Sequence, residues 1–177
     1  MKSRGMKCCE SSILERIARV AATPGTGTIE ELCEFLHIPA ENTAKAVVYQ
    51  RNADDSYVVA FIRGDLDINE TKLTNALGCE IHPAVIEDDS VLTAGFIGPV
   101  GINEKVTVLF DNSLKDIDYL VTGANKVDTH YTGFNVERDC PDAKYFDLAK
   151  IVEGGICPQC GKPHITISRG IEVGNIF

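Results

Sequence analysis

The chain has 177 residues, of which 44% are hydrophobic and 24% charged, and its formal net charge is −9. These values are typical of one soluble globular domain with a sizeable core, and the acidic balance argues against a protein that binds DNA or RNA along the phosphate backbone. No apolar run reaches the roughly 18 residues that a membrane span needs, and no signal-like segment opens the chain, so we expect a cytoplasmic protein without membrane partners.

Capping patterns predict helices near the N-terminus. The pattern Ser/Thr-x-x-Glu occurs at residues 12–15 and 28–31, each time before an apolar periodic run. Both patterns predict a helix that begins there, and the first helix would include Val20. Pro39 suits the first turn of a further short helix.

The next segments predict a hairpin and a capped helix. The β-rich runs 46–49 and 57–62 flank a polar turn, and the second run is almost wholly apolar, as in a central strand buried on both faces. Asn69 and Gly78 delimit a helix. Further along, the pattern predicts strands over 79–82, 105–110, 118–122 and 129–132, and a helical stretch over 88–93.

Strands and helices interleave without strict β-α-β alternation. We therefore predict an α/β (mixed α+β) fold with a curled, partly barrel-like mixed β-sheet surrounded by helices. The Glu-Gly-Gly at 153–155 separates a main domain, residues 12–152, from a C-terminal ribbon, residues 153–177.

A glycine loop, residues 95–101, combines three glycines and a proline with large apolar residues. Glycine lets another molecule approach the backbone, and Pro99 fixes its own φ. Such a loop, held against a core, could present amide N–H groups to an anion or an oxyanion. The alternative is a tight turn between buried strands, which the spacing alone favours.

Two basic side chains are candidate site residues. Lys45 stands where a short helix gives way to a strand, so its ammonium group could bind a phosphate or a carbonyl, or could simply extend into solvent. His130 lies near Gly123 and Asn125, which suggests a loop around a ligand, although a lone histidine is more often structural. The chain has no Gly-x-Ser-x-Gly elbow, no Walker loop and no dinucleotide fingerprint.

Cysteines suggest a metal site. The seven cysteines are an odd number without a secretion signal, which favours reduced thiols or a metal. Cys157 and Cys160, in Cys-Pro-Gln-Cys-Gly, supply half of a tetrahedral zinc site, with His164, Cys8 or Cys9 as candidates for the remaining ligands. The alternatives are a redox-active dithiol and a zinc-knuckle turn that no longer binds a metal ion.

Several segments together resemble the insertion (editing) domain of bacterial prolyl-tRNA synthetase, whose family includes YbaK-type deacylases. They are residues 22–25, 28–31, 39–45, 63–65, 95–101, 123–125, 130–135 and 138–139. The family hydrolyses the ester of alanine wrongly attached to proline tRNA. The resemblance therefore implies an aminoacyl-tRNA deacylase whose partner is the aminoacylated 3′ end of tRNA(Pro).

The resemblance also implies roles for individual residues. Lys45 matches the essential lysine that contacts the 3′-terminal nucleotide, and His130 matches the histidine that shapes the amino-acid pocket. The loop at 95–99, with catalytic Gly95, Gly98 and Pro99 and substrate-binding Phe96 and Ile97, matches the segment that positions the ester and a water. Gly123 and Asn125 match a further substrate-binding loop. The terminal ribose hydroxyl of the tRNA would assist the water, so that editing needs no cofactor.

The C-terminal run 169–177 resembles the return to the class II catalytic core, except that Asn175 replaces an expected histidine. No ATP site is visible, so we expect no aminoacylation by this chain alone and expect the rest of a prolyl-tRNA synthetase as a partner. The alternative is a tRNA-end binding or docking module without catalysis.

Overall fold

The computed structural model describes residues 18–86, 91–157, 160–168 and 170. The described strands are β1 (Arg19–Ala22), β2 (Ala44–Arg51), β3 (Tyr57–Arg63), β4 (Ile81–Pro83), β5 (Thr107–Asp111), β6 (Leu120–Gly123), β7 (Thr129–Phe134) and β8 (Tyr145–Phe146). The helices are α1 (Ile29–Leu36), α2 (Glu70–Leu77) and α3 (Val136–Asp139), with short 3-10 helices η1 (Ala40–Asn42) and η2 (Asn112–Leu114).

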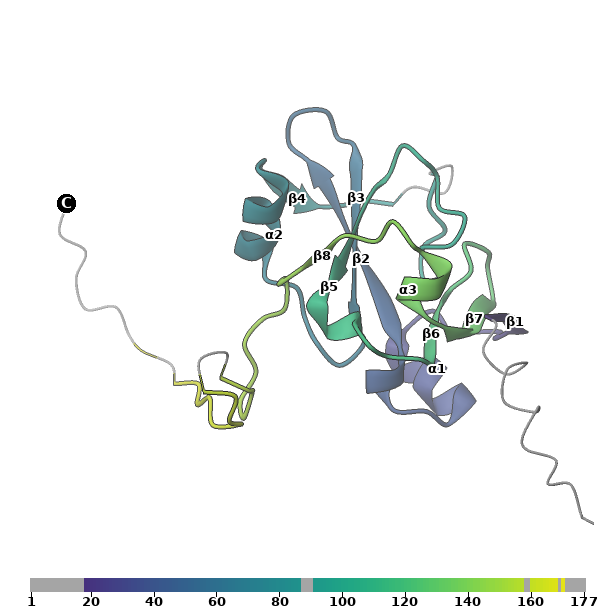
Figure 1. The fold of residues 1–177 in the computed structure, drawn as a ribbon. Helices are drawn as coiled ribbons and strands as arrows, with labels where there is room; N and C mark the ends of the chain where they lie inside the picture. Colours follow the sequence, from purple (N-terminus) through teal and green to yellow (C-terminus); the bar gives the residue numbers. More distant parts are fainter. Residues whose placement is uncertain (1–17, 87–90, 158–159, 169, 171–177) are drawn as a thin grey trace, which may run out of the picture.

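The strands form two sheets, one with the order β1-β7-β6 and one with the order β4-β2-β3-β5-β8 (Figure 1). In the larger sheet β2 pairs antiparallel with β3 and β4, whereas β3-β5 and β5-β8 are parallel. The mixed α+β class is thus confirmed. The strands divide into two sheets instead of one curled sheet, and the described residues form no closed barrel.

Strand β3 lies at the centre of the molecule, as its apolar sequence predicts. Its residues 58–62 are fully buried. Val59 and Phe61 pack into one core with β5 and β6, and Val58 and Ile62 pack into a second core with α2. The alternation follows from the two-residue period of a strand, which sends successive side chains to opposite faces.

Local capping signals in the described residues are confirmed. Thr28 caps α1, and its side chain and that of Glu31 form the reciprocal capping box. Asn69 caps α2, which ends at Gly78 in the left-handed conformation. The predicted helix through Val20 is wrong there, because Val20 lies in β1 and pairs with β7; residues 12–17 lie outside the described residues. Pairing with a distant strand has overridden the local helical period.

The predicted helical stretch over 88–93 is also wrong in its described part. Residues 91–93 form no helix, and residues 88–90 lie outside the described residues.

Two contacts connect the parts of the fold. Thr43, directly before β2, forms a parallel bridge with Val121 of β6 and so links the two sheets. The buried Asp111 carboxylate accepts hydrogen bonds from the backbone N–H groups of Leu148 and Ala149, at 2.7 and 3.0 Å. These bonds hold the segment around residues 148–149 against β5. Beyond this segment the chain projects outward as the C-terminal ribbon (Figure 1).

No described helix has the length and apolar character that crossing a membrane requires.

Candidate functional site

A pocket of about 240 Å³ lies where the two sheets approach each other. One wall is the start of β2, a second is formed by β6 and β7, and a third by the N-terminal turn of α1 and the glycine loop. The lining residues are Gly27, Thr28, Ile29, Leu32, Ala44, Lys45, Ala46, Gly95, Ile97, Val121, Thr122, Gly123 and His130. The pocket therefore combines five of the residues singled out from the sequence: Lys45, Gly95, Ile97, Gly123 and His130.

His130 is buried in the wall of this pocket. Its position on β7 is opposite Gly123 of β6 and Ala21 of β1, so it belongs to the middle strand of the smaller sheet. Its Nδ1 atom forms a hydrogen bond of 2.6 Å with the hydroxyl of Thr23, and its ring lies 5.4 Å from that of Phe96. Burial lowers the pKa of His130 below its usual value, so the imidazole is neutral at pH 7. A neutral ring held in this way can accept or donate one hydrogen bond but carries no charge to the ligand.

Lys45 is the only lysine or arginine in the described lining of the pocket. Its Nζ atom lies 3.1 Å from Oδ1 of Asp67, and the two side chains are 22% and 73% exposed. An exposed ion pair of this kind is weak, so an anionic ligand could take the place of Asp67 at low cost. Asp67 was not singled out from the sequence, because no local pattern connects two residues 22 positions apart.

Asn125 holds the glycine loop in shape. Its Oδ1 accepts a hydrogen bond from the N–H of Gly98, and its Nδ2 donates to the carbonyl groups of Gly98 and Val100, each bond being 2.9 Å long. Its own backbone N–H donates to the carbonyl of Phe96. Asn125 does not line the pocket. Its hydrogen bonds instead make it a residue that supports the glycine loop.

Gly98 and Gly123 touch backbone to backbone. A Cβ added to Gly98 would lie 1.6 Å from the carbonyl oxygen of Gly123, and one added to Gly123 would lie 2.3 Å from that of Phe96. Neither position can carry a side chain while the loop stays where it is. This contact sets the distance between the glycine loop and β6, and hence the width of the pocket.

The other residues of the predicted site lie apart from the pocket lining. Gly98 lies behind it, against β6, and Phe96 packs on His130 from within the core. Pro99 lines a different hollow of about 320 Å³, together with residues of β5 and the segment 140–144. The sequence could not separate these positions, because adjacent loop residues point in different directions.

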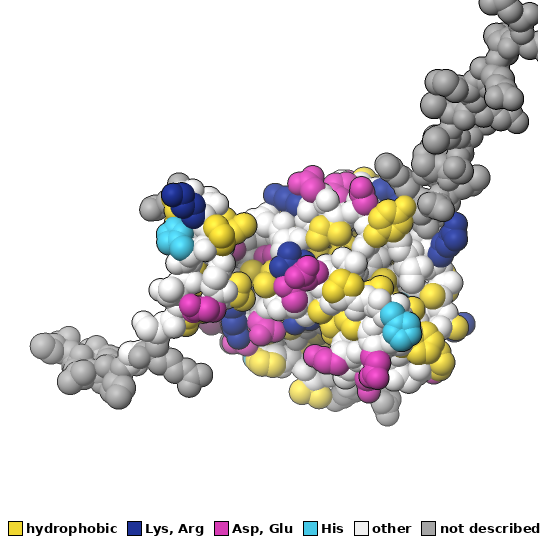
Figure 2. Space-filling model, turned by 90° about the horizontal axis from the view of Figure 1, so that it is seen from below, with side chains coloured by type: hydrophobic (Ala, Val, Ile, Leu, Met, Phe, Trp, Pro, Cys, Tyr) yellow, Lys and Arg dark blue, Asp and Glu magenta, His cyan; other side chains and the backbone are white. Residues whose placement is uncertain are grey.

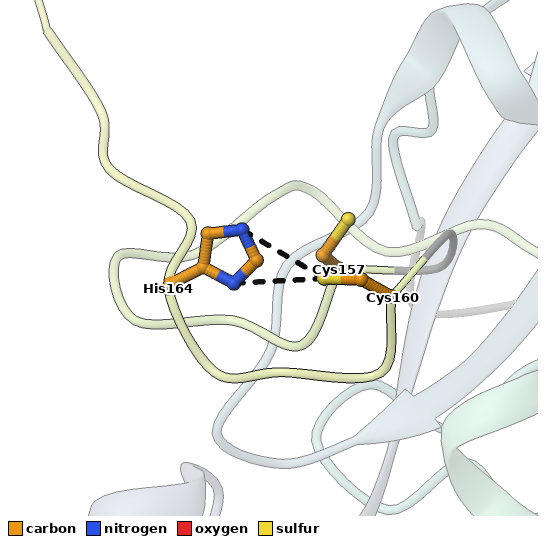
Figure 3. A group of neighbouring side chains, drawn as sticks. All are labelled: Cys157, Cys160 and His164. Carbon is orange, nitrogen blue, oxygen red and sulfur yellow. Dashed lines mark hydrogen bonds between the residues drawn. The ribbon is translucent and has the colours of Figure 1, made fainter.

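Cys157, Cys160 and His164 form a second group, on the C-terminal ribbon (Figure 3). One ligand atom of each residue lies within 4.8 Å of the others, so the group could hold a metal ion. The further candidates Cys8 and Cys9 lie outside the described residues. Cys33, Cys79, Cys140 and Cys160 are free thiols.

The burial of His130 predicts a pH dependence of stability. Its folded-state pKa is lowered, so its contribution is complete above the unfolded pKa of about 6.5 and is lost as the pH falls through the folded pKa. We expect the unfolding free energy to decrease below pH ~6.5 and the His130→Gln variant to show a flatter profile. Urea unfolding between pH 5 and 8 measures this. An equal flattening in His82→Gln, at a half-exposed histidine, would contradict the assignment to His130.

Comparison with known proteins gives one family. The profile of the aminoacyl-tRNA editing domain matches residues 23–139. A proline--tRNA ligase of Thermoanaerobacter sp. (strain X514) is 39% identical over 161 residues, which cover 88% of this chain and 28% of the ligase. One of Citrifermentans bemidjiense is 40% identical over 182 residues, which cover 99% of this chain and 30% of the ligase. The chain thus spans less than a third of the length of these curated relatives.

Solved structures show the same fold. A crystal structure of a proposed trans-editing enzyme for prolyl tRNA synthetase matches with a TM-score of 0.64 at 16% identity, covering 75% of this chain and 87% of that one. A crystal structure of a hypothetical protein matches with a TM-score of 0.65 at 17% identity, covering 76% of this chain and 92% of that one.

Proposed function

The chain belongs to the aminoacyl-tRNA editing domain family, and from this premise we propose that it hydrolyses the ester of alanine wrongly attached to proline tRNA. One observation carries the proposal: a single pocket is lined by Lys45, by Gly95 and Ile97 of the glycine loop, and by the neutral His130. The predicted site residues that line it come from four separate parts of the chain, and their convergence supports a binding site for a ligand with both an anionic and a small polar part.

Lys45 would bind the 3′-terminal nucleotide of the tRNA. A phosphate group would replace the exposed Asp67 as partner of the ammonium group, and the gain in charge complementarity would fix the end of the tRNA at the pocket. The reacting ester would then be held next to the glycine loop, so that little entropy is lost in bringing it to the reacting position.

The hydrogen bonds within the glycine loop leave few backbone amides that could stabilise the oxyanion. The N–H of Gly98 already donates to Asn125, that of Phe96 donates to Thr93, and Pro99 has none. Gly95 and Ile97 line the pocket, and their N–H groups make no hydrogen bond to another described residue. We therefore assign the oxyanion contacts to these two amides, with Gly98 in a supporting position.

The nucleophile would be a water molecule that the ribose hydroxyl of the tRNA helps to activate. The described lining of the pocket contains no serine, cysteine or carboxylate, and its hydroxyl groups are those of Thr28, which caps α1, and Thr122. An aminoacyl ester is already reactive, so positioning and oxyanion stabilisation are sufficient for its hydrolysis. For the same reason we propose that editing uses no metal.

The amino-acid preference would follow from the size of the pocket. Alanine is smaller than proline, so a synthetic site built for proline cannot exclude it by size, and a second, smaller site restores accuracy. On the face drawn in Figure 2, the described Lys and Arg side chains are dispersed among acidic ones instead of forming one basic patch. The chain would therefore act on one end of a tRNA that the rest of a prolyl-tRNA synthetase holds.

A deacylation assay tests this function. The chain is incubated with Ala-tRNA(Pro), Ser-tRNA(Pro) and Pro-tRNA(Pro), and the release of amino acid is measured against the spontaneous rate. We expect the alanyl ester to be hydrolysed fastest and the prolyl ester to be spared. Binding of the tRNA without release of alanine would instead support the alternative, a tRNA-end binding module.

A further inference from the structure

The described part of the C-terminal ribbon has no hydrophobic core that could hold it in place. None of its described residues is fully buried, and Ile156 and Ile167 are 69% and 53% exposed. The ribbon also projects away from the side of the body that carries β1 and β7 (Figure 1). Small segments without a core commonly depend on a metal ion or a disulfide for their structure.

The backbone of the ribbon nevertheless forms a tight turn. Ile156 and Pro163 form an antiparallel bridge, the N–H of Cys157 donates to the carbonyl of Lys162, and the N–H of Gly161 donates to the carbonyl of Cys157. Gly161 has a φ of +68°, a conformation that glycine adopts without strain. This turn brings the side chains of Cys157 and Cys160 to the same side as His164.

The geometry of the three side chains suits a tetrahedral metal. Both ring nitrogens of His164 lie 3.8 Å from Sγ of Cys160 (Figure 3). Tetrahedral bonds of ordinary zinc length place a sulfur and a nitrogen ligand about 3.6 Å apart, close to the distance between Cys160 and His164. The ligand atoms of all three residues lie within 4.8 Å of one another, so the side chains would close in on an ion.

A backbone carbonyl selects the ligand atom of the imidazole. Nδ1 of His164 lies 3.1 Å from the carbonyl oxygen of Lys162, to which it can donate its hydrogen. That tautomer leaves the lone pair of Nε2 free for a metal, and metal-binding histidines commonly have such an outer hydrogen bond. Two thiolates and one imidazole are the donors that zinc prefers.

We propose that Cys157, Cys160 and Nε2 of His164 bind one zinc ion, with a water molecule as the fourth ligand, and that the ion holds the ribbon in its fold. Zinc binding displaces the two thiol protons to solvent and forms two Zn–S bonds, without oxidation or reduction. The proposal is independent of the editing function, because none of the three ligands lines the editing pocket.

Metal analysis of the full chain tests the site. After removal of metals with a chelator and addition of zinc, we expect one zinc ion per chain and protection of two thiols from alkylation. Cobalt in place of zinc should give the absorption of a tetrahedral, thiolate-bound ion. Cys160→Ser and His164→Ala should each weaken zinc binding by more than about 100-fold, because loss of outer-shell partners alone costs up to that factor.

The controls separate this site from other cysteines. Cys33→Ser removes a free thiol of α1 and should bind zinc like the wild type, and far-UV circular dichroism should show that all variants remain folded. A chain without bound zinc, a stable disulfide between Cys157 and Cys160, or an equal loss of zinc in a Cys8→Ser/Cys9→Ser variant would each overturn the proposal.

Discussion

Replacement of Lys45 by alanine is expected to lower the rate of Ala-tRNA(Pro) deacylation by about 100-fold or more, the effect of removing one preorganised electrostatic contact from an active site. Lys45 lines the pocket, and among the described residues its ammonium group forms an ion pair only with the exposed Asp67, which a phosphate could replace. Without it, the end of the tRNA would lose its anchor and the ester its position next to the glycine loop. The measurement is the single-turnover rate of alanine release at saturating enzyme.

Lys72 offers a matched control for this experiment. Its ammonium group forms a similar ion pair with the exposed Asp147, at 2.8 Å, but it lies on α2 and does not line the pocket. Lys72→Ala should leave the deacylation rate within about 2-fold of the wild type and cost at most about 1 kcal/mol of stability. Equal rates for wild type and Lys45→Ala would remove Lys45 from the mechanism.

Substitution of Gly98 by alanine is expected to have the largest effect on stability. The new Cβ would lie 1.6 Å from the carbonyl oxygen of Gly123, a backbone atom of β6 that cannot rotate away. The glycine loop would have to move off the sheet and lose its hydrogen bonds to Asn125. We expect a loss of about 3 kcal/mol in the free energy of unfolding, the upper end of the usual cost of overpacking, together with a loss of deacylation. Denaturant unfolding measures the first and the alanine-release assay the second.

Gly101 lies in the same loop and provides the comparison. It has a φ of +73°, and an added Cβ would meet no atom within 4 Å, so Gly101→Ala tests backbone strain without a collision. We expect it to cost about 1 kcal/mol. If Gly98→Ala were no more destabilising than Gly101→Ala, the contact between Gly98 and Gly123 would not determine the position of the loop.

Much of the local structure could be predicted from neighbouring residues. The capping box at 28–31, the cap at Asn69 and the end of α2 at Gly78 depend on hydrogen bonds within one or two turns, and the structure confirms them. The central strand β3 could be predicted because a run of apolar residues requires burial on both faces. Val20 shows where such reasoning fails, since its neighbours favour a helix and its partner strand β7 lies over 100 residues away.

The sequence by itself determined which residues are candidates for the chemistry: Lys45, His130 and the glycine loop through the resemblance to a known family, and the two ribbon cysteines through their spacing. Only the tertiary structure decided how they are arranged. It gave Lys45 its partner Asp67, placed Asn125 behind Gly98, and separated Pro99 from the pocket. The physical reason is that these contacts join residues far apart in the chain. Asp67 follows β3, which pairs with the strand of Lys45, and Asn125 follows β6, which lies against the glycine loop.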